Sequence, residues 1–153
     1  MGYNIRILKS TARIAADRLD VVYDQMCALN VTHHNQKRGG RFSGGKQDDA
    51  WFSWMDPNYP HTCVNAAEIF QQMGFYVQYD VNGDLLLVDF DGSMGQEDLF
   101  LGAIRDNVTG KIRWAGEDGQ VWDTVFSDPG DVIAVERAMK FLSFVARLEN
   151  KDV

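Results

Sequence analysis

The sequence predicts an α+β domain, with an antiparallel sheet of about four strands in two hairpins and three to four helices packed on one face. Two strand pairs, within residues 75–90 and 111–126, each surround a tight turn that contains glycine. Apolar residues recur at helical spacing before, between and after these pairs. Because parallel strands need long crossovers, the tight turns disfavour a parallel βαβ arrangement. The length suits a single domain over residues 1–153.

The N-terminal segment combines a short strand with a helix. Residues 3–8 alternate loosely in polarity, which predicts an edge strand. Ser10 or Thr11 can cap the following helix, because a hydroxyl oxygen accepts the first free backbone amides. An apolar stripe then predicts an amphipathic helix that reaches residue 29. The residues of this stripe are Ala15, Leu19, Val22, Met26 and Leu29.

Residues 33–46 differ in composition from the rest of the chain. This segment, HHNQKRGGRFSGGK, contains four glycines and four basic residues but no acidic residue. We expect a mobile, solvated loop, because glycine pairs disfavour regular structure. An alternative is a nucleic-acid-binding module that contacts phosphates through the basic loop 37–46. Its basic residues are Lys37, Arg38, Arg41 and Lys46.

A dense aromatic segment and a second helix follow. Residues 48–60, DDAWFSWMDPNYP, are typical of a core or turn cluster, with a ligand-stacking platform as the alternative. Whether Trp51, Trp54 and Tyr59 are buried stays open at this level. Thr62 can cap a helix that ends at Gly74. Its inward-facing residues are Ala66, Ile69, Phe70 and Met73.

Two hairpins and a short helix form the next part of the chain. Asn82-Gly83 between two apolar runs predicts the first hairpin, because a two-residue turn of this kind needs positive φ at both positions. The segment EDLFLGAI at 97–104 predicts a helix whose acidic first turn suits the helix dipole. The second hairpin pairs 111–116 with 120–126 and places Trp114 near Trp122 across the strands.

A last helix is predicted near the C-terminal end of the sequence. Asp128 or Asp131 begins it, and apolar residues then repeat at helical spacing. This stripe consists of Val132, Val135, Met139, Leu142 and Ala146.

Charge is distributed unevenly along the chain. The net charge is +5 over residues 1–46, −10 over 47–104 and −2 over 105–153. The central 58 residues contain ten acidic and ten aromatic residues but no Lys or Arg. A disordered acidic tail would lack these aromatics, so we expect folded structure with an acidic surface. The overall charge of −7 argues against general binding to nucleic acid or anionic membranes.

One short segment is similar to a catalytic motif. Residues 85–93, LLLVDFDGS, resemble the first motif of haloacid-dehalogenase-type phosphatases. The resemblance implies that Asp89 is the nucleophile and Asp91 the acid/base, with Mg²⁺ between them. It covers nine residues, and the strand predicted here is the second arm of a hairpin rather than part of a parallel sheet. A Mg²⁺-dependent phosphatase is therefore kept as an alternative.

Metal and nucleophile patterns are weak. Asp80, Asn82 and Asp84 have the 1-3-5 spacing of a calcium loop, but Leu85 stands where that loop needs glycine. The histidines and cysteines match no closed zinc motif, and no serine lies in a Gly-x-Ser-x-Gly elbow. We therefore expect no catalytic residues, no metal site and no cofactor. The histidines and cysteines considered are His33, His34, His61, Cys27 and Cys63.

No membrane or secretory segment is expected. The N-terminal MGYNIRILKSTAR lacks an apolar core of signal-peptide length, and no run of 18 apolar residues occurs in the chain. We expect a soluble protein in the cytoplasm of a host cell.

Several segments together resemble small uncharacterised proteins of phages and prophages. These are HHNQKRGG, WFSWMDPNY, GQEDLFLGAI and W-x-GEDG-x-x-W, and the resemblance covers most of residues 23–126. A small acidic phage protein of this size is similar in class to anti-CRISPR and other anti-defence proteins. That likeness of class implies an inhibitory function and assigns no residues.

We therefore expect a non-enzymatic inhibitory protein that binds a basic, nucleic-acid-handling host complex. A folded surface of carboxylates can occupy a groove of Lys and Arg side chains and displace nucleic acid from it. The expected partner is a protein, and direct contact with nucleic acid or membrane is not expected. The candidate contact residues are Asp48, Asp49, Asp56, Asp80, Asp84, Asp89, Asp91, Glu97 and Asp98.

Overall fold

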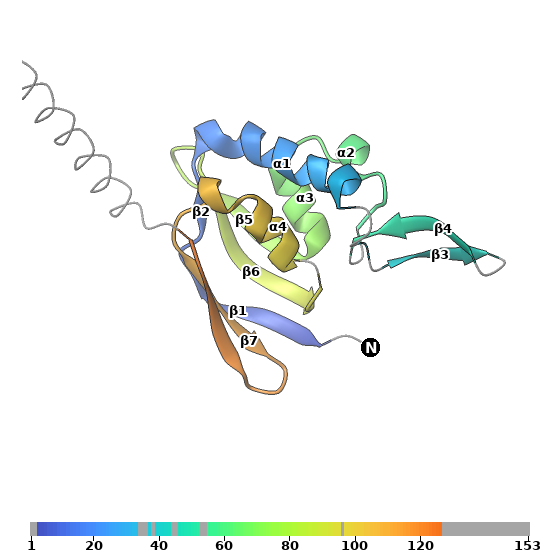
Figure 1. Cartoon of the computed structure of the whole chain (residues 1–153). Coiled ribbons are helices and arrows are strands. Elements are labelled where there is room, and N and C mark those ends of the chain that lie inside the picture. The colour runs from blue at the N-terminus through green and yellow to red at the C-terminus, as the bar shows by residue number, and fades with distance from the viewer. Residues whose placement is uncertain are drawn as a thin grey trace, which may run out of the picture.

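An antiparallel sheet forms the centre of the structure, a computed structural model (Figure 1). Strand β6 pairs with β5 along one edge and with β1 and β2 along the other, and β1 also pairs with β7, which pairs with β8. The strands are β1 (Asn4–Ser10), β2 (Arg13–Ile14), β5 (Phe75–Tyr79), β6 (Leu85–Ser93), β7 (Lys111–Gly116) and β8 (Val121–Val125).

The structure describes residues 3–33, 37, 39–43, 46–52, 55–95 and 97–126, with the backbone alone at 39–43 and 46–51. Trp54 and the helix predicted from Asp128 or Asp131 lie outside these residues.

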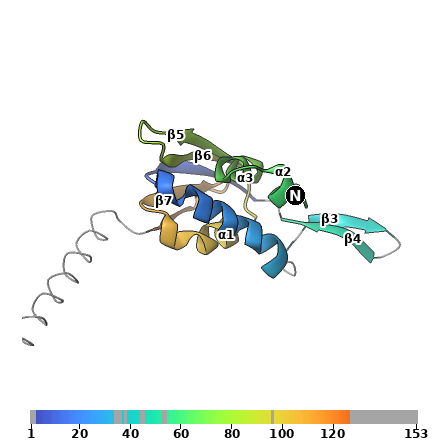
Figure 2. The same cartoon turned by 90° about the horizontal axis from the view of Figure 1, so that it is seen from above.

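Four α-helices of the described chain cover one face of the sheet (Figures 1 and 2). They are α1 (Leu19–Thr32), α2 (Tyr59–Thr62), α3 (Ala66–Met73) and α4 (Glu97–Ala103). Two single-turn 3₁₀ segments, η1 (Ala16–Arg18) and η3 (Arg105–Asn107), precede α1 and follow α4. The predicted class, an antiparallel sheet with helices on one face, is confirmed.

The core lies between these helices and the sheet. Phe75 and Phe90 from the first hairpin pack edge-on against each other with ring centroids 4.8 Å apart, and Trp114 from β7 packs against both. Phe70 of α3 reaches Phe75 at 5.7 Å, so this aromatic cluster joins a helix to three strands. Such edge-to-face pairs add to the stabilisation from buried area alone.

The N-terminal segment differs from its prediction in two ways. Residues 4–10 form a central strand between β6 and β7, not an edge strand. The helix begins at Leu19, not directly after Ser10 or Thr11, because Arg13–Ile14 pairs with β6 as β2. The Ser10 hydroxyl instead accepts the Ala12 amide at 3.2 Å within the connection of β1 to β2.

Helix α3 is capped by a different residue from the one predicted. Thr62 ends α2, and Asn65 caps α3 by accepting the Glu68 amide at 2.9 Å. The Glu68 carboxylate in turn accepts the Val64 amide at 2.7 Å, a reciprocal arrangement close to the capping box. The end of the helix is as predicted, since Gly74 is left-handed with φ of 112°.

The first hairpin has a longer loop than the two-residue turn predicted. Gly83 has φ of 83°, but its amide bonds to the Asp80 carbonyl at 3.1 Å, which puts Val81 and Asn82 at the centre of the turn. The Asp80 carboxylate accepts the amides of Asn82 and Asp84 at 2.9 and 3.0 Å, and these bonds favour the longer loop.

The second hairpin and the short helix are confirmed. Strands β7 and β8 pair antiparallel, and Trp114 lies directly opposite Trp122. Helix α4 begins at Glu97, as its acidic first turn predicts.

The segment 33–46 contains a strand where a loop was predicted. Gly39–Ser43 forms β3, which pairs with β4 (Lys46–Trp51) as a separate two-stranded sheet. Strand structure therefore replaces the predicted loop at 39–43.

Before this hairpin, the Lys37 ammonium lies 5.5 Å from the centre of the Phe52 ring, which is a cation–π contact. Burial lowers the pKa of Lys37.

Candidate functional site

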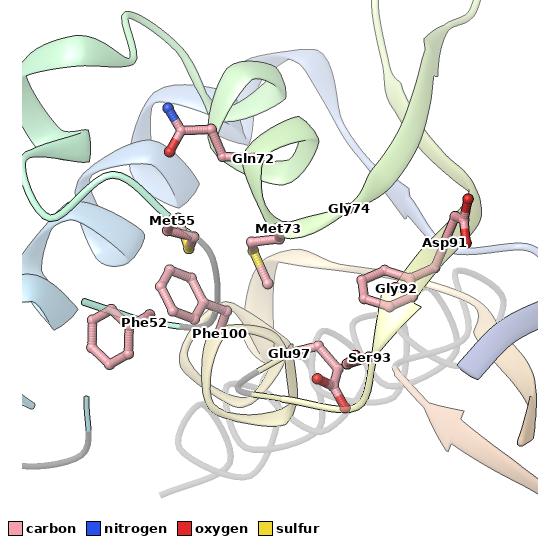
Figure 3. Close-up of a pocket in the computed structure, with 11 residues that line it drawn as sticks. Phe52, Met55, Gln72, Met73, Gly74, Asp91, Gly92, Ser93, Glu97 and Phe100 are labelled. Atoms are coloured by element: carbon pink, nitrogen blue, oxygen red, sulfur yellow. The ribbon is translucent and has the colours of Figure 1, made fainter. Parts of the chain in front are cut away.

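A pocket of about 150 Å³ opens where the end of α3, the end of β6 and the start of α4 meet (Figure 3). Its walls are mainly apolar, and its polar lining includes Gln72, Ser93 and Glu97. The apolar walls are formed by Phe52, Met55, Met73, Phe90 and Phe100. An apolar pocket with a few converging polar groups is the usual form of a small-molecule site.

The turn after α3 brings one wall of this pocket into place. Gly74 has positive φ, and a Cβ atom there would lie 2.9 Å from the Asp91 carbonyl oxygen and 3.3 Å from the Phe90 ring. The Asp91 amide donates to the Gly74 carbonyl at 3.0 Å, which joins the start of the first hairpin to the end of β6. Only glycine combines this conformation with so close an approach.

The aromatic segment before α2 forms the opposite wall. Phe52 packs edge-on against Phe100 of α4, with ring centroids 5.1 Å apart. Tyr59 is fully buried and donates from its hydroxyl to the Met26 carbonyl of α1 at 2.5 Å. Phe52 and Tyr59 are therefore part of the core, and neither offers an exposed ring for ligand stacking.

Glu97 is the one buried charged side chain among the described residues, with 5% of its surface exposed. Its Oε2 atom accepts the Gly95 amide at 2.7 Å. Burial raises the pKa of this carboxyl, and the nearby Asp98 charge adds to the increase, while the backbone amides of Gly95 and Glu97 oppose it. Figure 3 shows Glu97 on the first turn of α4, with its carboxylate beside Ser93 where β6 ends.

Four more candidate contact residues either line this pocket or are next in sequence to a residue that lines it. Asp91 is one of the lining residues, and Asp56, Asp89 and Asp98 each adjoin a lining residue in the chain. The side chains of Asp89, Asp91 and Asp98 are exposed, and that of Asp56 is half-buried. In Figure 3 the Asp91 carboxylate points away from the pocket. The carboxylates of Asp56, Asp89, Asp91 and Asp98 are called the acidic rim below.

Two candidate contact residues belong to a different part of the molecule. Asp80 and Asp84 both accept from Arg13 of β2, at 2.6 and 3.2 Å, and the Asp84 carboxylate also accepts the Ala16 amide at 2.9 Å. Burial alone would raise the pKa of Asp80, but backbone amides and Arg13 hold it below its ordinary value. Asp84 directly precedes β6 and Asp91 is the seventh residue of that strand, so a length of about 20 Å of extended chain separates the two.

The backbone places the last two candidates in the separate hairpin. Asp48 and Asp49 belong to β4, with Asp49 opposite Arg41 of β3. Strand β4 ends at Trp51, next to the pocket-lining Phe52.

The outer face of the sheet carries charges of both signs. Arg6 of β1 is the register partner of Asp91, and Arg113 of β7 forms a two-pronged ion pair with Asp123 of β8 at 2.9 and 3.2 Å. The described outer face of the sheet is therefore not uniformly acidic.

The structural context of the phosphatase resemblance is missing from the described chain. Every strand pairing of the described residues is antiparallel, and β6, which carries Asp89 and Asp91, lies between β5 and β1. The resemblance implies a parallel sheet. Within the same residues, no three His, Cys, Asp or Glu side chains gather closely enough to hold a metal ion.

Sequence reasoning placed Glu97 on an exposed acidic surface and did not find the pocket. A signal was present, because Glu97 stands at i with Phe100 and Leu101 at i+3 and i+4, on the apolar stripe of α4. An acidic residue on the buried stripe of a short helix indicates either a capping role or a site.

Comparison with protein-family models, curated proteins and solved structures finds no match to this chain. Among the described helices, none is both long and apolar enough to cross a membrane.

Proposed function

We propose that this protein is a non-enzymatic, phage-type inhibitor of the anti-CRISPR and anti-defence class, acting in the cytoplasm of a host cell. It binds a basic, nucleic-acid-handling protein complex through the acidic rim and the adjoining Glu97. Asp48 and Asp49 of β4 are further candidate contact residues.

The observation that carries the proposal is the position of the acids. The stretch 47–104 contains ten acids and no base, and five of its nine candidate contact residues line or adjoin one pocket. No Lys or Arg of the described chain forms an ion pair with the acidic rim, whereas Arg13 already pairs with Asp80 and Asp84. The proposed contact surface therefore excludes Asp80 and Asp84.

Electrostatic competition explains how such a surface would inhibit a complex that binds nucleic acid. Proteins that grip nucleic acid present grooves of Lys and Arg to a regular array of phosphates. A group of carboxylates held by the fold would compete for the same groove, and long-range attraction would speed its encounter with the partner.

Capture from a lysate tests this proposal. The immobilised protein is expected to retain nucleic-acid-processing subunits from a bacterial host lysate. A variant with Asp56, Asp89, Asp91 and Asp98 all replaced by Asn should retain on the order of ten-fold less, because it loses the complementary charge. Asparagine keeps the local amide acceptors of Asp56 and Asp89, so the fold should survive.

A control variant separates position from net charge. Asp17→Asn, Asp24→Asn, Asp106→Asn and Glu117→Gln remove four charges from exposed residues away from the pocket. Capture by this control should stay near the wild-type level. If both variants lose capture equally, the effect comes from net charge and not from the position of the acids. If the captured material lacks nucleic-acid-processing subunits, the proposed partner is wrong. Phosphate release from generic substrates, lost in Asp89→Asn, would instead support the phosphatase.

A further inference from the structure

We infer that the pocket is a binding site for a small organic cation, an ammonium or guanidinium group on a short apolar body, with Glu97 as its counter-ion. The site would bind such a cation whether or not the acidic rim around it binds a protein.

The volume of the pocket limits the size of the ligand. About 150 Å³ is similar to a cavity that admits benzene, and it is well below the 300–1,000 Å³ that is typical of drug-sized sites. The ligand body therefore has about six to eight non-hydrogen atoms. A benzyl group and the side chain of arginine both fall in this range.

The walls suit an apolar body that carries a positive charge. Phe52, Phe90 and Phe100 offer aromatic surface, which attracts a cation through the negative face of the ring. Met55 and Met73 add flexible, polarisable surface that adapts to different shapes. The walls are also held in place, since Phe90 packs against Phe75 and Trp114 at 4.8 and 5.5 Å, and Phe52 packs against Phe100.

The Glu97 carboxylate favours a positively charged ligand over a neutral one. A carboxylate accepts about four hydrogen bonds, and among the described residues the Gly95 amide donates one to Oε2 of Glu97. The pocket lining contains no Lys or Arg. Lys37, which lies over Phe52, forms no ion pair with Glu97 within the described part of the chain. A desolvated carboxylate without a cationic partner favours a ligand that brings one.

Methionine methyl groups allow the site to be tested directly. In ¹³C-methyl spectra of the full chain, benzylammonium should shift the signals of Met55 and Met73, which line the pocket, and leave buried Met26 unchanged. At neutral pH the dissociation constant should be at least ten-fold lower for benzylammonium than for benzyl alcohol, its neutral analogue, and benzoate should not bind.

Two variants test whether the preference for benzylammonium over benzyl alcohol comes from the Glu97 carboxylate. In Glu97→Gln the two ligands should bind with similar affinity, and binding of benzyl alcohol would show that the pocket is intact. Asp98→Asn removes the same charge from the exposed neighbour and should keep the ten-fold preference. If Glu97→Gln does not fold, the comparison of ligands on the wild-type protein decides the matter alone.

A peptide ligand tests whether the bound cation is a protein side chain or a free small molecule. A Gly-Gly-Arg-Gly-Gly peptide that shifts the same methyl signals would assign the cation to a protein side chain, and a response to benzylammonium alone would assign it to a free small molecule. Both outcomes support the site. Equal affinities for benzylammonium and benzyl alcohol, or no shift of Met55 and Met73, would overturn it, and neither result depends on capture from a lysate.

Discussion

Glu97 combines burial with charge, and its surroundings differ from those of every other described acid. Three carboxylates of the acidic rim, those of Asp89, Asp91 and Asp98, are exposed, and Asp80 and Asp84 share Arg13. Among the described residues, only backbone amides donate hydrogen bonds to the Glu97 carboxylate. Burial is therefore the largest influence on its pKa, and it raises that pKa. This cost in folding free energy is typical of a binding or catalytic position rather than of a structural one.

The stability of the Glu97→Gln variant should depend on pH in a defined direction. Because the pKa of Glu97 is higher in the folded than in the unfolded state, its contribution to stability is complete at acidic pH and is lost as pH rises through the folded value. Glutamine does not titrate. The free energy of unfolding of the variant, relative to wild type, should therefore increase from pH 4 to pH 7, as measured by urea denaturation.

Asp98→Asn serves as the control for this series. It removes a neighbouring exposed charge while Glu97 stays in place. The same increase with pH in both variants would trace the effect to net charge, and a flat difference for Glu97→Gln would contradict the burial argument.

At the scale of elements, the link between β1 and the second hairpin holds the sheet together. The Thr11 amide donates to the Lys111 carbonyl at 2.8 Å, and the Thr11 hydroxyl accepts the Lys111 amide at 3.0 Å. Gly110 precedes this contact with φ of 93°, and its carbonyl accepts the Phe126 amide at 2.8 Å. One glycine thus joins the start of β7, the end of β8 and the connection of β1 to β2.

Replacing Gly110 by alanine should destabilise the protein on the order of 3 kcal/mol. A Cβ atom there would lie 2.1 Å from the Thr11 carbonyl oxygen, and the left-handed backbone conformation is unfavourable for alanine. Thermal and urea denaturation would measure the loss.

Gly102 provides the matched control for this substitution. It is exposed within α4, and a Cβ atom there would meet nothing within 4 Å. Gly102→Ala should stabilise the protein by about 0.5–1 kcal/mol, because alanine favours the helix. A small effect of Gly110→Ala, similar in size to that of Gly102→Ala, would contradict the close contact with Thr11.

At the scale of the whole molecule, charge is separated between the two ends of β6. Arg13 pairs with Asp80 and Asp84 at the turn between β5 and β6, while Asp89 and Asp91 lie toward the opposite end of β6, where the pocket opens. The outer face of the sheet carries both signs. Within the described residues, the acids at the turn are paired with Arg13, whereas those of the acidic rim form no ion pair with Lys or Arg.

Association with a captured partner should depend on salt. Raising the ionic strength from about 0.05 to 0.5 M shortens the screening length, so the association rate constant should fall on the order of ten-fold. The variant with the four Asp→Asn changes in the acidic rim should show a weaker dependence. Surface plasmon resonance measures both, and a rate constant unaffected by salt would contradict electrostatic steering by the rim.

Predictions from the sequence were accurate where neighbouring residues determine the structure. The second hairpin, the left-handed Gly74 at the end of α3 and the acidic start of α4 follow from patterns a few residues long. Errors arose where two local signals compete. Both Thr62 and Asn65 can cap a helix, and the bonds from the Asp80 carboxylate favour a longer loop than Asn82-Gly83 alone indicates.

The sequence by itself determined the α+β class, the order of most described elements and the concentration of acids in the central stretch, because these depend on periodicity and composition. Only the tertiary structure placed β1 at the centre of the sheet, brought Arg13 to Asp80 and Asp84 across 67 and 71 positions, and buried Glu97 in a pocket. Contacts between residues so far apart form only when the whole chain closes around its core, and no local pattern contains them.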